Sequence, residues 1–147
     1  MTITLATLAS ATPQDVFDQV VAHAREQRRK SLVGGSGSDG SSCAYRGAGD
    51  HLKCFGGALI SDKEMEELSI ANNVAWKTTA NHLNIHAHEE LISNLQNIHD
   101  CFTVSQWDSR FSHTAGVHQL DYEPQHIDEA VIPYADGYIP YAGDDNE

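Results

Sequence analysis

The side chains best suited to chemistry are three cysteines and nine histidines. Thiolates and imidazoles are the usual ligands of zinc, so Cys43, Cys54 and Cys101 with nearby histidines could form a metal site. No HExxH or CxxC pattern occurs in the chain. His88 and His99 share a face of one expected helix but would lie about 16 Å apart at 1.5 Å per residue. We therefore predict no bound metal and no other cofactor.

Nucleophilic catalysis by Cys54 is the second chemical possibility. Lys53 and Arg46 would lower the pKa of the thiol if they faced the sulfur. The alternation of side chains in an expected hairpin instead places Cys54 on the apolar face, away from both cations. Glu89 and Glu90 are adjacent on a helix, so their carboxylates point apart. We predict no catalytic residue and favour a protein without enzyme activity, with a small metal- or thiol-dependent enzyme as the alternative.

The element that would position the cysteines is a β-hairpin. Residues 47–50, Gly-Ala-Gly-Asp, suit a tight turn because glycine and aspartate adopt positive φ readily. Pairing across this turn predicts an apolar face with Cys43, Tyr45, Leu52 and Cys54, and an opposite face with Ala44, Arg46, His51 and Lys53. An isolated hairpin is marginal in water, so helices must cover its apolar face.

About four helices are expected from apolar residues at helical spacing. The first begins after Thr12 as N-cap, with Pro13 at its first position, and the second begins after Ser61, where Glu64 completes a capping box. A short helix or irregular segment is expected over 74–83. The strongest pattern runs from His86 to Phe102, and Ser105 is the expected N-cap of a last helix that carries Trp107, Phe111 and Ala115.

The 147 residues are predicted to form one domain. We expect a loose leader or short edge strand over 1–11, a domain over 12–120 with a flexible Gly/Ser loop at 34–42, and an acidic tail over 121–147. The fold class is therefore predicted as α+β, a mostly helical small domain with one β-hairpin.

The formal net charge is −12, with nine lysines and arginines. Because nucleic acids and anionic membranes bind proteins through cations, we expect neither as a direct partner. No apolar run approaches the ~18 residues of a membrane span. A basic protein, or a nucleic-acid-binding protein with a basic groove, fits the charge better. Four cations, Arg25, Arg28, Arg29 and Lys30, gather where the first helix should end; they complement the helix dipole or form an anion-binding spot.

The tail 121–147 has eight acidic residues, no lysine or arginine, and four of the five tyrosines. Tyrosines add contact area to a charged segment, which favours a binding function. The tail either packs on its own domain or is ordered by a partner. The predicted partner-binding residues are Tyr122, Asp128, Glu129, Tyr134, Asp136, Tyr138, Tyr141, Asp144 and Asp145.

Three separated blocks resemble a family of small uncharacterised tailed-bacteriophage proteins. The first is a helix pattern over residues 20–31 that includes His23, Gln27 and Ser31. The second joins CAYRG at 43–47 to LKC at 52–54, Gly57, Leu59-Ile60 and Asp62. The third is LQxxHD within 91–100, followed by Trp107. The family often carries cysteine at the position of Ala58 and proline at that of Ser61. The resemblance implies a phage or prophage origin and a site in the host cytoplasm, and it carries over no activity and no catalytic residue.

The leading hypothesis is a phage accessory protein that binds a host protein through an acidic surface and inhibits or redirects it. The host target would be a nucleic-acid-binding or defence protein. A structural or assembly component of the phage is a further alternative, and homo-oligomerisation is left open.

Overall fold

The computed structural model describes residues 2–33, 43–47 and 51–130. Its five α-helices are α1 (Pro13–Gln27), α2 (Asp62–Glu67), α3 (Trp76–Leu83), α4 (Glu89–Cys101) and α5 (Trp107–His118). Three short 3-10 helices cover Leu8–Ser10, Gly57–Leu59 and Val104–Gln106. Within the described residues the only β pairing is a single antiparallel bridge between Leu32 and Cys43, so this part of the chain is a mostly helical small domain.

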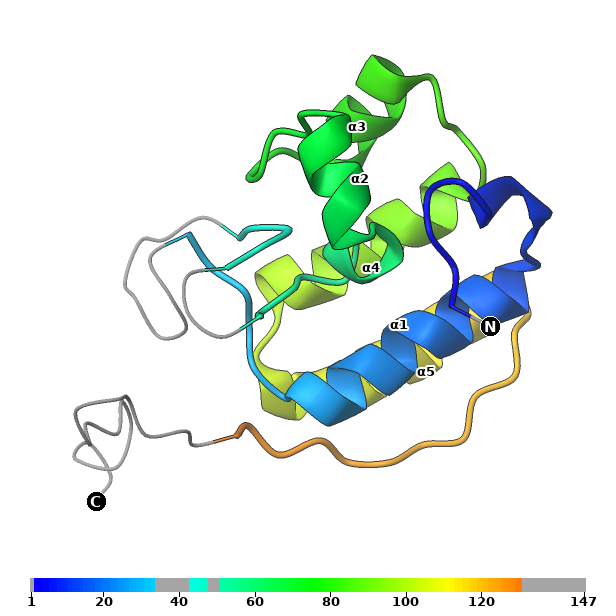
Figure 1. Ribbon diagram of the computed structural model, residues 1–147. Coiled ribbons are helices and arrows are strands. Elements are labelled where there is room, and N and C mark those ends of the chain that lie inside the picture. The colour runs from blue at the N-terminus through cyan, green and yellow to red at the C-terminus, as the bar shows by residue number, and fades with distance from the viewer. Residues whose placement is uncertain (1, 34–42, 48–50, 131–147) are drawn as a thin grey trace, which may run out of the picture.

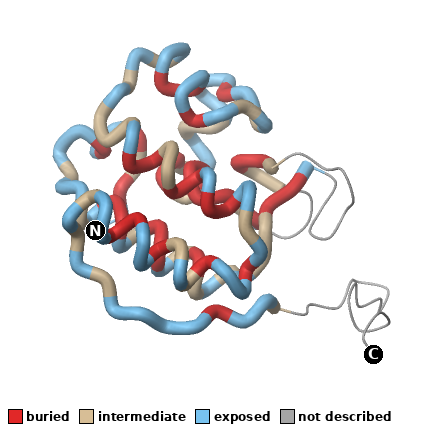
Figure 2. Tube along the Cα trace, turned by 180° about the vertical axis from the view of Figure 1, so that it is seen from behind, coloured by how far each residue is buried: buried red, intermediate tan, exposed pale blue. Residues whose placement is uncertain are grey.

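Helix α4 is the centre of the domain. It packs against α1, α3 and α5. In Figure 1 it crosses the middle of the molecule, with α3 above it and α1 and α5 below. The aromatic core lies between these helices: the Phe55 ring stacks on Phe111 at 5.5 Å and meets Trp107 at 4.8 Å, while Phe17 meets Phe111 edge-on at 6.2 Å. Figure 2 shows the buried residues concentrated on the facing sides of the helices.

The predicted starts of α1 and α2 are confirmed. Thr12 and Asp15 form a reciprocal capping box, in which each side chain accepts a hydrogen bond from the other's backbone N–H at 3.1–3.2 Å. Ser61 and Glu64 do the same for α2. The apolar stripe of α1 is fully buried, as its spacing predicts; it comprises Val16, Phe17, Val20, Val21 and Ala24.

The predicted cap of the last helix is wrong. Ser105 lies inside the 3-10 helix that precedes α5, and the capping box there joins Thr103 to Gln106. The stripe of Trp107, Phe111 and Ala115 is buried as predicted. The helix expected from His86 starts at Glu89, because His88 adopts a left-handed conformation with φ 57°.

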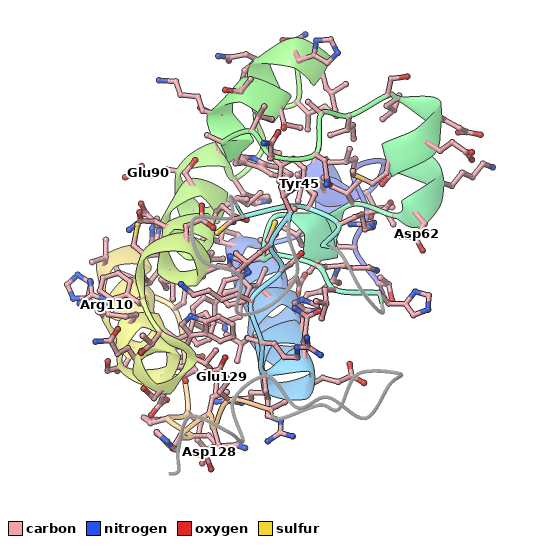
Figure 3. All side chains as sticks on the ribbon, turned by 90° about the vertical axis from the view of Figure 1, so that its left-hand side faces the viewer. Tyr45, Asp62, Glu90, Arg110, Asp128 and Glu129 are labelled. Atoms are coloured by element: carbon pink, nitrogen blue, oxygen red, sulfur yellow. The ribbon has the colours of Figure 1, made fainter. Side chains whose placement is uncertain are left out.

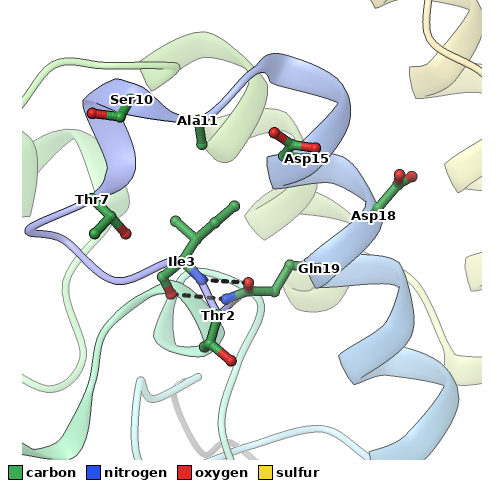
Figure 4. A pocket seen from close by; sticks show the side chains of 8 residues that line it. All are labelled: Thr2, Ile3, Thr7, Ser10, Ala11, Asp15, Asp18 and Gln19. Atoms are coloured by element: carbon green, nitrogen blue, oxygen red, sulfur yellow. Dashed lines mark hydrogen bonds between the residues drawn. The ribbon is translucent and has the colours of Figure 1, made fainter.

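The N-terminal segment is not a loose leader. Ile3, Leu5 and Leu8 are buried in the main core. The Gln19 side chain on α1 holds the main chain of Ile3 from both sides, accepting from its N–H at 2.7 Å and donating to its carbonyl at 2.9 Å (Figure 4). The open hollow drawn in Figure 4 lies between this segment and α1.

The predicted β-hairpin does not form a ladder of paired strands. The chain reverses, since Gly47 N–H donates to the Leu52 carbonyl at 2.9 Å. However, the Tyr45 N–H donates to the Asn72 carbonyl instead of to a facing strand. Turn residues 48–50 lie outside the described residues. The fold class α+β is therefore corrected to helical for the part that the structure describes.

Burial around the reversal follows the predicted alternation only in part. Tyr45, Leu52 and Cys54 are buried as predicted, and Cys43 is half-buried. Ala44 was expected on the polar face but is also buried. Its N–H donates to the Ser31 carbonyl, so Ala44 lies against the segment that follows α1.

Residues 121–130, here called the strap, run extended along α1 from its first turn to its last (Figure 1). Near its start, Tyr122 packs edge-on against Phe17 at 5.7 Å and donates to Asp108 at 2.5 Å. Near its end, Ile127 is only 2% exposed and Ala130 N–H donates to the Arg28 carbonyl. The ordered packing thus continues past residue 120. Within the described residues, no helix is both long and apolar enough to cross a bilayer.

Candidate functional site

The structure brings together three side chains that could do chemistry. Donor atoms of Cys43, His99 and Asp100 lie within 4.8 Å of one another. His99 and Asp100 come from the last turn of α4, whereas Cys43 comes from the segment 43–47. The CxYRG and LQxxHD blocks, far apart in sequence, therefore meet in space. Cys101 lies on the same turn of α4 as His99 and Asp100. It is exposed, and its thiol donates to the Asn97 side-chain oxygen at 3.1 Å.

His99 is held as a neutral ring by two hydrogen bonds. The backbone N–H of Ser31 lies 3.0 Å from Nε2 and can only donate, so Nε2 carries no proton. The proton is therefore on Nδ1, which donates to the Asp100 carboxylate at 2.9 Å. The ring is fully buried, and this burial lowers the pKa of His99 against the opposing effect of Asp100.

Asp100 is the acceptor at the centre of the cluster. Its carboxylate accepts from Gln96 Nε2 at 2.7 Å, from His99 Nδ1, and from the Cys43 thiol. Partial burial acts to raise the pKa of Asp100, but the hydrogen bonds from His99, Cys43 and Gln96 outweigh burial and lower the pKa below its usual value. Asp100 is thus a stable carboxylate surrounded by donors.

Both neighbouring cysteines are protonated thiols at neutral pH. Burial, reinforced by the hydrogen bond to Asp100, raises the pKa of Cys43 well above its ordinary value. Burial also raises the pKa of Cys54 to about 12, and its sulfur accepts from the Gly57 N–H at 3.4 Å. Because the thiolate is the nucleophilic form, neither sulfur is activated for attack.

The geometry also differs from that of a cysteine–histidine catalytic pair. In such a pair the thiol gives its proton to an imidazole that a third group orients. Here the Cys43 thiol donates to a carboxylate, and both nitrogens of His99 are engaged by Ser31 and Asp100. Neither nitrogen of the His99 ring is therefore free to take the proton of the Cys43 thiol.

The hydrogen bonds of His99 disfavour a zinc ion in this cluster. Three donor atoms would suffice for a site with one open position, so the count of ligands does not decide the matter. Ligation through Nδ1 of His99 would move its proton to Nε2. Nε2–H would then face the Ser31 N–H at 3.0 Å, placing two donors against each other. Ser31 therefore fixes the tautomer that disfavours a metal.

A hollow of about 370 Å³ lies beside the cluster, lined by Cys43, Tyr45, Cys54, Asn72, Asn73, Val74, Ala75, Gln96 and Asp100. Several of its polar groups are already paired. Tyr45 Oη bonds to Thr79 at 2.7 Å, and Gln96 Oε1 accepts from the Gly56 N–H at 2.6 Å. The network joins α4 to the CxYRG segment, so its main effect is to hold these two blocks together.

Arg46, predicted on an exposed polar face, is a structural residue. Its guanidinium is half-buried and donates to three carbonyls, those of Tyr45, Gly57 and Ile60, at 2.6–3.0 Å. Its Nε pairs with Asp62 at 2.8 Å. These contacts tie the reversed segment to the start of α2, and nothing in the sequence pattern of alternating residues could have shown them.

The predicted partner-binding residues fall into three groups. Tyr122 is half-buried against the core, as described above. Asp128 and Glu129 are exposed at the end of the strap, well away from Tyr45 in Figure 3. The remaining six lie outside the described residues: Tyr134, Asp136, Tyr138, Tyr141, Asp144 and Asp145. The assignment of the strap residues to partner binding stays a prediction.

Comparison of the chain with models of protein families, with curated proteins and with solved structures gave no match. The resemblance to tailed-phage proteins therefore stays a prediction. What can be argued about function comes from the contacts and charges of the chain itself.

Proposed function

We propose that the chain is a phage-encoded accessory protein that binds a basic host protein in the host cytoplasm through an acidic surface, and thereby inhibits or redirects it. The observation that carries this proposal is that cations and carboxylates differ in their contacts with the rest of the chain. Four of the cations, Arg25, Arg28, Lys30 and Arg46, donate to backbone carbonyls, whereas most carboxylates of the described residues face solvent.

Three arginines illustrate how the cations are used. Arg25 donates to the Glu123 carbonyl at 2.7 Å, and its guanidinium lies 5.4 Å from the Tyr122 ring centre. Arg28 reaches the Asp128 carbonyl at 3.5 Å, and Arg46 binds three carbonyls. Carbonyl oxygens carry no formal charge. Arg25 and Arg28 therefore fasten the chain without neutralising a surface carboxylate, whereas Arg46 also pairs with Asp62 at 2.8 Å.

The exposed carboxylates are distributed along α1, α2 and the strap. They include Asp15, Asp18, Glu26, Asp62, Glu66, Glu67, Asp121, Glu123, Asp128 and Glu129. Such a surface attracts positively charged partners and speeds their encounter, and it repels phosphate backbones. A basic protein partner is the class that this charge distribution supports best.

The cysteine–histidine cluster gives the enzyme alternative less support. Its thiols are protonated, its histidine has both nitrogens engaged, and its carboxylate is saturated with donors. A binding function needs none of these groups to react.

A capture experiment tests the proposal. The full chain and a chain ending at Ala130 would be immobilised and exposed to bacterial lysate. The cut is placed after residue 130 because Ile127 is buried and an earlier cut would open the core. We expect a basic host protein to be retained at 0.1 M salt and released towards 1 M, where the Debye length falls from about 10 Å to about 3 Å.

Loss of capture in the shortened chain would assign binding to residues 131–147, and retention would assign it to the strap and helices. A thermal melt of each protein shows that the shortened chain is still folded. Capture of no salt-sensitive partner by either chain would reject the proposal.

A further inference from the structure

A small groove between α4 and α5 is lined without any acidic side chain. It has a volume of about 180 Å³ and is lined by Asn94, Asn97, Ile98, Phe102, Arg110, His113, Thr114 and Val117. No carboxylate is among these residues, although the chain carries a formal charge of −12. All of its polar side chains can donate hydrogen bonds.

Arg110 is the cation of this groove. Figure 3 shows it on the side of α5 that faces away from α1. Its guanidinium carbon lies 4.5 Å from the centre of the Phe102 ring, as in a cation–π stack. Its Nε is buried, and no acceptor among the described residues lies within hydrogen-bond distance of it.

Two other buried nitrogens of the described residues lack a partner, Arg25 Nε and Trp76 Nε1. Arg25 differs from Arg110 because its guanidinium donates elsewhere, to the Glu123 carbonyl at 2.7 Å. Trp76 is 1% exposed and lies in the core beside Tyr45. Arg110 alone of the three lines a groove in which it has no acceptor among the described residues.

The stacking defines what Arg110 can bind. The aromatic ring covers one face of the planar guanidinium, so its N–H groups point outward along the edge. Two parallel N–H groups on that edge match the two oxygens of a carboxylate or phosphate. No hydrogen bond or ion pair among the described residues engages Arg110, so the terminal N–H groups of its guanidinium are available to an acceptor that enters the groove.

Neighbouring side chains extend the set of donors. Asn97 Oδ1 already accepts from the Cys101 thiol at 3.1 Å, which leaves the Asn97 amide group as a donor. Thr114 and His113, one turn after Arg110 on α5, add a hydroxyl and a ring nitrogen to the lining. The volume of about 180 Å³ is below the ~300–1,000 Å³ of sites for larger ligands. The groove therefore has room for one small charged group.

We propose that the α4–α5 groove is an oxyanion site that takes a single phosphate or carboxylate group, anchored by the guanidinium of Arg110. This site has the opposite charge preference to the acidic surface, and it is independent of the function proposed above. The two sources, a phosphoryl group and a carboxylate, share the same recognition chemistry and are separated by the experiment.

The test follows the side-chain Nε–H signals of ¹⁵N-labelled full-length protein by NMR. Inorganic phosphate and acetate are added in separate titrations at constant ionic strength. We expect one signal, identified by its absence in Arg110→Lys, to shift and saturate. Tighter binding of phosphate assigns a phosphoryl group, and tighter binding of acetate assigns a carboxylate.

Two variants and one control make the test specific. Arg110→Lys keeps the positive charge but loses the pair of parallel N–H groups, and it should weaken anion binding at least about tenfold. Asn97→Asp places a carboxylate on the rim of the groove and should abolish binding without changing the size of the side chain. Arg29→Lys, at the end of α1, should bind as the parent does. The proposal is overturned if neither anion saturates the Arg110 signal, or if both groove variants bind like the parent.

Discussion

Replacing Asp100 by asparagine is the most direct test of how the cluster holds the fold. In Asp100→Asn the three donors from Gln96, His99 and Cys43 lose a charged acceptor, and the new NH₂ group is itself a donor. Hydrogen bonds to a charged group contribute about 1.5–3 kcal/mol each. The Asp100 side chain is 38% exposed, so solvent screening reduces this figure. We expect a loss of about 2 kcal/mol in the free energy of unfolding.

Urea denaturation monitored by tryptophan fluorescence measures this loss, because Trp107 stacks on His99 at 5.9 Å. The matched control is Asp128→Asn, which changes an exposed strap carboxylate that pairs with His126 at 3.0 Å. The control should change stability by less than about 0.5 kcal/mol. A change of the same small size in Asp100→Asn would refute the conclusion that Asp100 holds the two sequence blocks together.

The same cluster predicts a window of pH in which the protein is most stable. The pKa of His99 is lowered from 6.5, so the unfolded chain binds more protons than the folded one below pH 6.5, and stability falls as pH drops through this region. The lowered pKa of Asp100 adds a further loss below its ordinary value of 3.8. The raised pKa of Cys43 removes stability above 9.0, where only the unfolded thiol ionises. Unfolding free energies measured across pH should therefore peak between 6.5 and 9.0.

Three further predictions test other contacts. Gly57→Ala should destabilise the protein by about 2–3 kcal/mol in urea denaturation, because the added Cβ would clash with the Tyr45 carbonyl oxygen. A neutral result would contradict this close approach. Ile127→Ala should cost about 2 kcal/mol and increase hydrogen exchange in the strap, since Ile127 is buried; unchanged exchange would show that the strap is not anchored there. Elemental analysis should find no stoichiometric zinc. Iodoacetamide at pH 8 should label exposed Cys101 before buried Cys54. Bound zinc, or equal labelling of the two cysteines, would reject the description of the thiols.

Local signals in the sequence predicted the starts of α1 and α2 correctly. The capping boxes at Thr12 and Ser61 involve residues only three positions apart, so no distant contact is needed to form them. Ser105 was predicted as the cap of the last helix, but the capping residue is Thr103, two positions earlier, and it opens the 3-10 helix that precedes α5. The glutamine three residues after Thr103 was the local signal that separates them.

The reversed segment could be predicted as a bend but not as part of a sheet. Glycines near residue 47 and the alternation of apolar residues indicated a reversal with Tyr45 and Cys54 inside, and this is observed. The backbone partners, however, are the carbonyls of Ser31 and Asn72, and these residues belong to other parts of the chain. Side-chain alternation carries no information about such partners.

The contacts of the strap with the helices could not be predicted from the sequence either. Composition favoured an extended acidic tail, and residues 121–130 are indeed extended. A lone Ile127 among acids, with Tyr122 before it, was the only sequence signal for docking. Whether these two side chains find a surface depends on the groove that α1 and α5 form together.

The sequence by itself determined the approximate places of the main helices, the caps of α1 and α2 and the buried helix faces, because these depend on contacts between residues three or four positions apart. Only the tertiary structure brought Cys43 to Asp100, placed the Ser31 N–H on His99, and left Arg110 without an acceptor among the described residues. Each of these depends on a side chain meeting a group from a distant segment. Packing decides such meetings, and with them the protonation states of the Cys43, His99 and Asp100 side chains.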